Sequence, residues 1–476
     1  MADNTGKALR TKMIYSVFIR NYSKEGTFEA LRQDLDRIRA LGTDIIWLMP
    51  VHPVGEKHRK GTLGSPYAIR DYRAVNPEFG SMEDFVNLTN DIHEKGMKVI
   101  IDVVYNHTSP DSVLAKEHPE WFFHKKDGSF GNKTGDWWDV IDLDYNNRAL
   151  WDYQIETLKI WARYVDGFRC DVAPMIPIEF WMQARQEIEE VRPGCIWLAE
   201  SVEPEFILDN RRRGITCASD SEIFRAFDIS YEYDVYWDFN RYLTGEEPLA
   251  SYAQALNRQE AMYPDNYDKL RFLENHDRLR ARFLIPQEQA LRNWLAFVFF
   301  QKGTTLIYAG QEAGAARTPS LFDKDPVDWD GTLGVNTRPL DLSQEIARLH
   351  EIVQDPVFAN SSYHVSAMQE NVLGAIHVQN SEPSAEVSGT GAAATGTAAA
   401  AGTAAFAGIF PLGSRPCVIR LARLTEGAAG SPVIPDGSYT NLIDGSRVEV
   451  SMGEMTVTEK PVIFKFDSAV PAGDRG

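Results

Sequence analysis

Residues 98–107 have the sequence KVIIDVVYNH, an apolar run that ends in polar side chains. A continuous apolar run of this kind is typical of a parallel strand that is covered on both faces. Its end places Asp102, Asn106 and His107 where such a strand would meet solvent. Seven similar runs lie at residues 14–19, 44–50, 165–173, 195–201, 224–230, 269–277 and 304–312. The eight runs together predict eight parallel strands.

Amphipathic helical stretches separate these runs. Phe28, Leu31, Leu35, Ile38 and Leu41 recur at spacings of three and four residues, as on one face of a helix. The stretch from Ser81 has Asp84 three residues later, which resembles a helix-capping box with Asp in place of Glu. Eight strand–helix units between residues 14 and 355 predict an α/β chain with a (β/α)8 TIM barrel. A doubly wound open sheet is the alternative.

The barrel is predicted to carry one insert and one further domain. Residues 1–106 and 148–357 are assigned to the barrel, and residues 107–147 form a long excursion after the third strand, expected to be a small inserted lobe. From residue 358 to residue 476, short strand-like runs with turn signals predict a C-terminal all-β sandwich domain. It is interrupted at about residues 385–408 by a stretch of Ala, Gly and Thr, interpreted as a flexible loop.

Charge and hydropathy exclude several classes of partner. The 476 residues have a formal net charge of -19, whereas nucleic acids and anionic membranes require a basic surface. The sequence contains no run of about 18 apolar residues, so no membrane span is expected. The N-terminus lacks the apolar core of a secretory signal, which predicts a cytoplasmic protein, or an extracellular one if a leader was removed.

Charged and polar residues gather at the predicted strand ends. In a barrel of this type the working residues lie at the carboxyl ends of the strands. One such side chain alone would be explained by an ion pair or a capped loop, but several converging on one face indicate a functional site. Besides the residues of the third strand, the set comprises Arg169, Asp171, Glu200, Glu274, His276 and Asp277. Paired carboxylates suit glycoside hydrolysis, in which one attacks the sugar and the other donates a proton.

Four motifs resemble those of the α-amylase family of glycoside hydrolases, family 13. They are DVVYNH at 102–107, GFRCDVA at 167–173, WLAES at 197–201 and FLENHD at 272–277. SPYAIRDYRAVNPEFG at 65–80, IDLDYNN at 141–147 and GTTLIYAGQE at 303–312 resemble further family segments. Because the four motifs occur in order over the whole predicted barrel, the resemblance is specific. It also implies the inserted lobe and the C-terminal sandwich.

The resemblance implies a retaining mechanism with three carboxylates. Asp171 matches the family's nucleophile, and Glu200 matches its general acid/base. Asp277 matches the third carboxylate, which holds sugar hydroxyls and favours the distorted ring without reacting. Neighbours of the acid should raise its pKa, while a cation beside the nucleophile should keep it ionised.

The resemblance also implies a substrate-binding set. Arg169 matches the residue that orients the nucleophile, and His107 and His276 match a pair that hydrogen-bonds the sugar in the cleaved subsite. Tyr67 matches the aromatic residue that stacks under that sugar, and Asp102 matches a structural residue at the barrel mouth.

Two features depart from typical α-amylases. Pro174 and Met175 stand where the family usually has Lys-His after the nucleophile, which weakens the expectation of strict α-amylase specificity and of the usual calcium site. Asn106 and Asp142 match two other positions of that site, so a structural calcium is retained as a candidate, although the chemistry requires no cofactor. The insert is short, which suggests an open cleft. Trp137 and Trp138 in it are candidates for sugar stacking or for the lobe's own core.

The sequence therefore predicts a glycoside hydrolase of the α-amylase type. The expected substrates are maltooligosaccharides or starch, cleaved at α-1,4-glucosidic bonds through a covalent glycosyl-enzyme. An α-glucosidase, a neopullulanase-like enzyme and a glucosyltransferase of the same family are alternatives, because all four share the intermediate. A non-catalytic relative is disfavoured, because Asp171, Glu200 and Asp277 are all present.

Overall fold

The computed structural model describes residues 5–135, 137–334, 340–379, 403–413, 416–428 and 432–468. The chain divides into two compact units. The first comprises Met1–Trp237, Met262–Pro286 and Gly303–Glu351, and the second comprises Asp238–Ala261, Gln287–Lys302 and Ile352–Gly476. The predicted boundaries between barrel, lobe and sandwich stay predictions.

The first unit contains a closed barrel of eight parallel strands, in the order β1-β10-β9-β8-β7-β6-β3-β2. The strands are β1 (Met13–Val17), β2 (Ile45–Leu48), β3 (Lys98–Val103), β6 (Gly167–Cys170), β7 (Ile196–Ala199), β8 (Ile229–Tyr231), β9 (Lys269–Arg271) and β10 (Thr304–Tyr308). Each falls in or beside one of the eight predicted runs, so the predicted barrel is confirmed. The first and last strands pair, Met13 with Thr305, which rules out the open doubly wound sheet.

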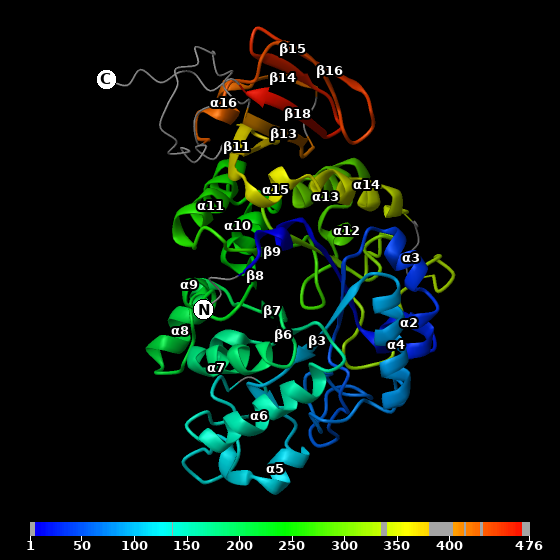
Figure 1. Cartoon of the computed structure of the whole chain (residues 1–476), viewed down its shortest axis with the longest axis vertical. Coiled ribbons are helices and arrows are strands. Elements are labelled where there is room, and N and C mark those ends of the chain that lie inside the picture. Colours follow the sequence, from blue (N-terminus) through cyan, green and yellow to red (C-terminus); the bar gives the residue numbers. More distant parts are fainter. Residues whose placement is uncertain are drawn as a thin grey trace, which may run out of the picture. The chain divides into compact units, whose positions relative to one another are not determined.

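Helices follow the strands along the chain, and Figure 1 shows α4, α6 and α7 outside the strands β3, β6 and β7. The longer helices of the first unit are α4 (Met82–Glu94), α6 (Arg148–Trp161), α7 (Ile178–Glu189) and α8 (Pro204–Arg212). Its shorter helices are η2 (Lys7–Thr11), α1 (Ile19–Tyr22), α2 (Phe28–Arg32), α3 (Leu35–Ala40), η4 (Ala173–Met175), α9 (Asp220–Ile223) and α12 (Ala281–Leu284). Three helices contain residues of both units: α10 (Tyr233–Leu243), α14 (Ser343–Val353) and, by its last residue alone, α11 (Leu249–Met262).

The predicted capping box at the start of α4 is present. The Ser81 hydroxyl accepts a hydrogen bond from the Asp84 amide at 3.2 Å, and Asp84 Oδ2 accepts one from the Ser81 amide at 2.7 Å. These bonds satisfy two backbone donors that a helix start otherwise leaves unpaired. Phe85, Leu88 and Ile92 then bury the inner face of the helix.

The excursion after β3 forms a small lobe. Its strands β4 (His107–Thr108) and β5 (Ile141–Asp142) pair antiparallel, with His107 opposite Asp142. Between them lie α5 (Val113–Glu117), η3 (Pro119–Trp121) and the isolated bridge between His124 and Phe130. Because β4 follows directly from the end of β3, the lobe begins at the carboxyl end of the barrel.

The second unit contains α11 (Leu249–Met262), α13 (Glu288–Phe300), α15 (Pro356–Asn360), α16 (Ala422–Thr425) and two antiparallel four-stranded sheets. One sheet has the order β11 (Ser362–Gln369), β12 (Val372–Val378), β13 (Thr403–Pro411) and β18 (Val462–Ser468). The other has the order β14 (Cys417–Arg420), β17 (Glu454–Val457), β16 (Arg447–Ser451) and β15 (Gly437–Thr440). The predicted all-β architecture of the C-terminal region is therefore confirmed.

The prediction of a flexible loop at about residues 385–408 is wrong for its last residues, 403–408, which form part of a strand. Thr403–Gly408 belong to β13, which pairs with β12 on one side and with β18 on the other. The small side chains of Ala405 and Ala407 are buried in the core of the sheets, where neighbouring strands supply the hydrogen bonds that composition alone does not reveal. The rest of the predicted loop lies outside the described residues.

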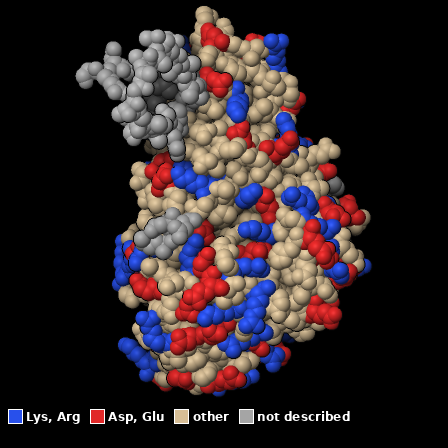
Figure 2. All heavy atoms as spheres, in the orientation of Figure 1, with Lys and Arg blue, Asp and Glu red and all other residues tan. Residues whose placement is uncertain are grey.

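Over the part of the chain that the structure describes, no helix has the length and apolar character needed to span a membrane. Figure 2 shows acidic and basic side chains interspersed over the face in view. This mixture agrees with a net charge that is negative overall.

Candidate active site

The predicted catalytic residues lie at the carboxyl ends of neighbouring strands. Asp102 and Arg169 are paired in register on β3 and β6. Asp171 follows the last residue of β6, and Glu200 follows the last residue of β7. Because parallel strands of a barrel end at one face, this order along the chain places the side chains around one centre.

The Arg169 guanidinium joins three carboxylates. Its Nη1 donates to Asp102 Oδ1 at 2.9 Å and to Asp171 Oδ1 at 2.8 Å. Its Nη2 lies 2.9 Å from Glu200 Oε1 as an ion pair. The arginine side chain is fully buried. One buried cation therefore fixes the nucleophile and acid candidates relative to one another.

Aromatic rings surround the same guanidinium. Its central carbon lies 5.1 Å from the ring centre of Trp47, 5.5 Å from that of Tyr231 and 5.6 Å from that of Tyr67. Tyr231 also accepts a hydrogen bond from Arg169 Nε at 3.3 Å. Ring faces attract a cation and exclude water, so they help to hold the charge in place.

Glu200 is held by a second group besides Arg169. Its Oε2 accepts a hydrogen bond from the Val172 amide at 2.8 Å. Val172 has φ 39° and ψ 42°, a left-handed conformation that β-branched residues rarely adopt. This unusual conformation directs the backbone N–H that follows the nucleophile toward the acid.

Asp277, His276 and Tyr67 form the other side of the site. His276 Nε2 lies 3.1 Å from Asp277 Oδ2 and 2.7 Å from the Tyr67 hydroxyl, and the rings of Tyr67 and His276 are stacked. The Tyr67 hydroxyl also donates to Asp102 Oδ2 at 3.2 Å. Asp277 has 40% of its side chain exposed, so its carboxylate is open to a ligand.

His107 borders the nucleophile from the lobe. Its Nε2 lies 3.8 Å from Asp171 Oδ2, and its Nδ1 lies 3.1 Å from the Asn106 amide nitrogen. Burial lowers the pKa of His107 to about 4, so the ring is neutral at pH 7. A neutral imidazole beside the carboxylate can donate to a hydroxyl without competing for the nucleophile's charge.

The three carboxyl groups of the site differ in pKa. Burial raises the pKa of Glu200 to about 8, although Arg169 acts to lower it. Burial also raises the pKa of Asp171 to about 6, again against Arg169. Burial acts in the same direction on Asp277, but the charge and hydrogen bond of His276 outweigh it and hold that pKa below its usual range. Near pH 7 the site thus offers a protonated Glu200 and an ionised Asp171.

Asp142, one of the two candidate calcium ligands, is buried beside Lys133. Asp142 Oδ2 accepts the Lys133 amide at 2.7 Å, and Oδ1 is buried without a hydrogen-bond partner. Nearby carbonyls are already engaged, because Leu143 O accepts Lys133 Nζ at 3.3 Å and Lys133 O accepts Arg213 at 2.7 Å. Calcium requires six to eight oxygens. Over the described ranges no cluster of three or more His, Cys, Asp or Glu side chains could hold a metal.

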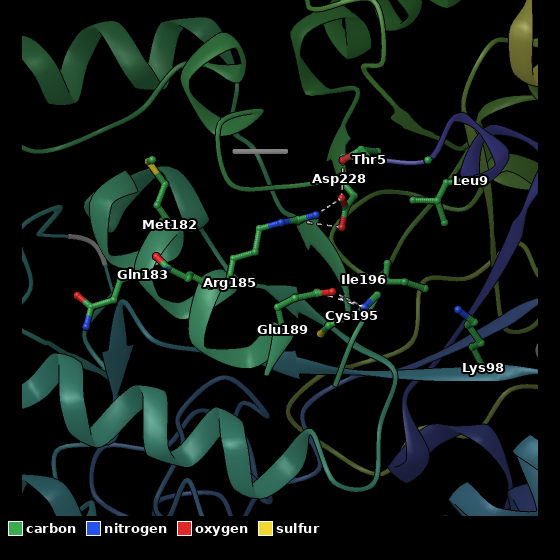
Figure 3. Close-up of a pocket in the computed structure, with 13 residues that line it drawn as sticks. Thr5, Leu9, Lys98, Met182, Gln183, Arg185, Glu189, Cys195, Ile196 and Asp228 are labelled. Carbon is green, nitrogen blue, oxygen red and sulfur yellow. Dashed lines mark hydrogen bonds and ion pairs between the residues drawn. The ribbon is translucent and has the colours of Figure 1, made fainter. Parts of the chain in front are cut away.

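A second pocket lies at the opposite end of the barrel (Figure 3). It is lined by residues at the starts of strands, such as Lys98 of β3 and Ile196 of β7. Two of its charged groups pair with each other, since both terminal guanidinium nitrogens of Arg185 bind Asp228, at 2.6 and 3.0 Å. This pocket contains none of the predicted catalytic residues, so the carboxylate cluster remains the candidate active site.

The structure brings together all seven predicted catalytic and substrate-binding residues, and it adds two that the sequence did not single out. Tyr231 ends β8 and could have been found by the same strand-end argument. The Val172 amide could not have been found in this way. A backbone N–H leaves no signal in the sequence, and a valine gives no sign of a left-handed conformation.

Comparison with known proteins agrees with this geometry. The family model "Alpha amylase, catalytic domain" matches residues 4–140 and 117–345, and "Bacterial Alpha amylase C-terminal domain" matches residues 400–464. An α-amylase structure from Lactobacillus plantarum is 44% identical, with a TM-score of 0.86, and the match covers 97% of this chain and 100% of that one. The maltogenic α-amylase AmyB from Thermotoga neapolitana is 30% identical, with a TM-score of 0.79 and coverage of 97% and 99%.

Curated relatives match over shorter stretches. An α-1,4-glucan:maltose-1-phosphate maltosyltransferase from Rhodospirillum rubrum is 34% identical over 197 residues, which are 37% of this chain and 28% of that protein. The first several relatives of this kind are matched over about a third of their own length. The catalytic-domain match, however, extends over most of the chain. The chain therefore belongs to the α-amylase family of glycoside hydrolases.

Proposed function

We propose that this enzyme cleaves α-1,4-glucosidic bonds of maltooligosaccharides or starch with retention of anomeric configuration. The observation that carries the proposal is the shared contact of Asp171 and Glu200 with the Arg169 guanidinium. Two carboxyl groups on one guanidinium favour the short separation of retaining enzymes, about 5–5.5 Å, over the wider one of inverting enzymes. The α-amylases among the similar structures support the substrate class.

The proposed reaction has two steps. In the first, Asp171 attacks the anomeric carbon while Glu200 gives its proton to the departing glycosidic oxygen, so that the glucosidic bond breaks as the ester bond forms. In the second, ionised Glu200 takes a proton from water, whose oxygen displaces Asp171 from the same carbon. The split in pKa between Asp171 and Glu200 prepares both groups for the first step.

The remaining residues position the sugar. We assign the open carboxylate of Asp277 and the neutral ring of His107 to hydroxyl groups of the cleaved unit. Tyr67 offers a ring on which the apolar face of that unit can stack. Asp102 stays a structural partner, because it is fully buried against Arg169.

Transfer to a sugar acceptor is the second candidate activity. The glycosyl-enzyme reacts with whichever acceptor reaches it, and several curated relatives are maltosyltransferases. Pro174 and Met175, which stand in place of the usual Lys-His, are buried after the nucleophile and offer no charged side chain to an acceptor. The α-glucosidase and neopullulanase-like activities remain further alternatives. Chromatography of products from maltoheptaose separates these cases, because transfer creates chains longer than the substrate.

Substitution of the two reacting carboxyl groups tests the assigned roles. Asp171→Asn should lower kcat on maltoheptaose by at least about 10⁴-fold, because the amide cannot form the intermediate. Glu200→Gln should lose comparable activity on maltoheptaose but retain far more on α-maltosyl fluoride, whose leaving group needs little protonation. Thermal melts check that both variants fold. Equal loss on both substrates in Glu200→Gln would contradict its role as the acid.

A plot of kcat/KM against pH should be bell-shaped. The nucleophile works ionised, so kcat/KM should rise as pH passes the pKa of Asp171, about 6. The acid works protonated, so kcat/KM should fall as pH passes the pKa of Glu200, about 8. Initial rates on maltoheptaose from pH 4 to pH 10 measure both limbs. On α-maltosyl fluoride, Glu200→Gln should lose the alkaline limb only, and a persisting alkaline limb would assign it to another group.

We also propose that the lobe requires no calcium and that Lys133 provides the positive charge beside Asp142. A structural calcium at about a hundredfold its Kd would stabilise the fold by about 2.7 kcal/mol. EDTA should therefore leave the Tm unchanged, whereas a bound calcium would make it fall by several degrees. Lys133→Met should lower the Tm, while Lys126→Met, which changes an exposed lysine of the same lobe, should not. A rise in Tm on adding calcium to the EDTA-treated enzyme would contradict the proposal.

A further inference from the structure

Lys60 links the loop after β2 to the lobe. Its Nζ lies 2.8 Å from Asp139 Oδ1, and the Asp139 side chain is only 4% exposed. The same ammonium lies 5.5 Å from the ring centre of Trp138 and 5.7 Å from that of Phe322. We call Lys60, Trp138, Asp139 and Phe322 the Lys60 clasp. It joins three segments that follow different strands: the loop after β2, the lobe after β3 and the loop after β10.

The loop that carries Lys60 is held firmly against the segment that carries Phe322. The Leu63 amide donates to Phe322 O at 2.9 Å, and the amide and hydroxyl of Thr62 donate to Asp323 Oδ1 at 2.9 and 2.7 Å. Gly61 has φ +62°, and a Cβ there would lie 2.6 Å from Phe322 Cβ. The base of the clasp is thus fixed by hydrogen bonds to the segment of Phe322, and the Lys60 side chain reaches from it to Asp139 of the lobe.

The clasp lies beside the candidate active site, on the side of His107. The Trp137 ring is 5.3 Å from the His107 ring, and Trp138 and Asp139 follow it directly in sequence. The charges of Lys60 and Asp139 also act on the pKa of His107. His107 in turn faces Asp171. The clasp is built on the loops after β10, β2 and β3, which are grouped around β1 in the barrel order, whereas the acid Glu200 follows β7, the strand opposite β1 in that order. The acid must face the leaving group, so the clasp lies toward the sugar units that stay on the enzyme.

We propose that the Lys60 clasp closes the cleft at the non-reducing end and limits the number of glucose units accepted beyond the cleaved bond. The inference rests on the proposed function. A non-reducing terminal glucose carries a free 4-hydroxyl, where an internal unit carries a glycosidic oxygen and a further sugar. The Lys60 ammonium has three N–H donors and can bind that hydroxyl, while a longer chain would have to displace the ion pair.

The exposure of Trp138 favours a sugar over other kinds of ligand at the Lys60 clasp. Trp138 is 58% exposed, and the Lys60 ammonium lies near one part of its ring. An exposed indole face suits the apolar face of a pyranose. In the proposed subsite the ring of the terminal glucose stacks on Trp138, and its free hydroxyl binds Lys60.

A blocked substrate tests the proposal. We would compare 4-nitrophenyl α-maltoheptaoside with its analogue in which an ethylidene group bridges the 4- and 6-hydroxyls of the non-reducing end, and separate the products by chromatography. The wild-type enzyme should release short units from the free end and should cleave the blocked substrate at least about tenfold more slowly, since a hydrogen bond to a charged donor is lost. Lys60→Ala should bring the two rates together and release longer units.

Two further variants make the test specific. Asp139→Asn keeps the shape of the side chain but removes the ion pair with Lys60, so the cleavage rates of the free and blocked substrates should also move closer together. This variant serves as the test if Lys60→Ala does not fold. Lys57→Ala removes an exposed lysine from the same loop and should leave the ratio at its wild-type value. Thermal melts check that each variant folds.

The outcomes separate this inference from the function on which it rests. A wild-type enzyme that cleaves both substrates equally, or a folded Lys60→Ala enzyme with an unchanged ratio and product length, would overturn the role of the clasp while leaving α-glucan cleavage intact. A wild-type enzyme that cleaves neither substrate and does not act on maltoheptaose would instead overturn the proposed function and the inference with it.

Discussion

The buried Arg169 guanidinium is the constraint on which the rest of the site depends. A cation taken out of water costs several kcal/mol unless partners compensate it, and here three carboxylates and a cage of aromatic rings surround it. Removing one partner of such a cluster typically costs about 3–5 kcal/mol. The strands that supply these partners are therefore held in one register. Asp102 shows this most clearly. It lies opposite Arg169 in the pairing of β3 with β6, and its side chain also accepts a hydrogen bond from the Arg169 guanidinium.

The same cation affects the pKa of both reacting carboxyl groups. Burial raises the pKa of both, and Arg169 opposes burial in both. Arg169 also hydrogen-bonds Asp171 and so lowers its pKa further, whereas the negative charges of Asp171 and Asp277 raise the pKa of Glu200. The nucleophile thus stays ionised at a pH where the acid keeps its proton. One buried charge thus acts on the pKa of both groups.

The sequence was sufficient for the barrel and for most of the site, because both follow from local patterns. Apolar runs mark strands, and polar residues directly after them must meet at one end of a closed barrel. The pattern could not reveal contacts between segments far apart in the chain, such as Lys60 with Asp139. Nor could it reveal the left-handed backbone of Val172 or the engaged carbonyls around Asp142. Composition also misled at Thr403–Gly408, because pairing on both edges makes a strand of residues with weak strand preference.

The most direct test of the account is the anomeric configuration of the first product, because only a covalent intermediate on Asp171 gives two inversions at one carbon. Proton NMR during the first minutes of maltoheptaose hydrolysis, before mutarotation equalises the anomers, measures it. The account predicts that the newly formed reducing end appears as the α-anomer. A β-anomer formed first would mean a single displacement by water, and Asp171 could then not be the nucleophile.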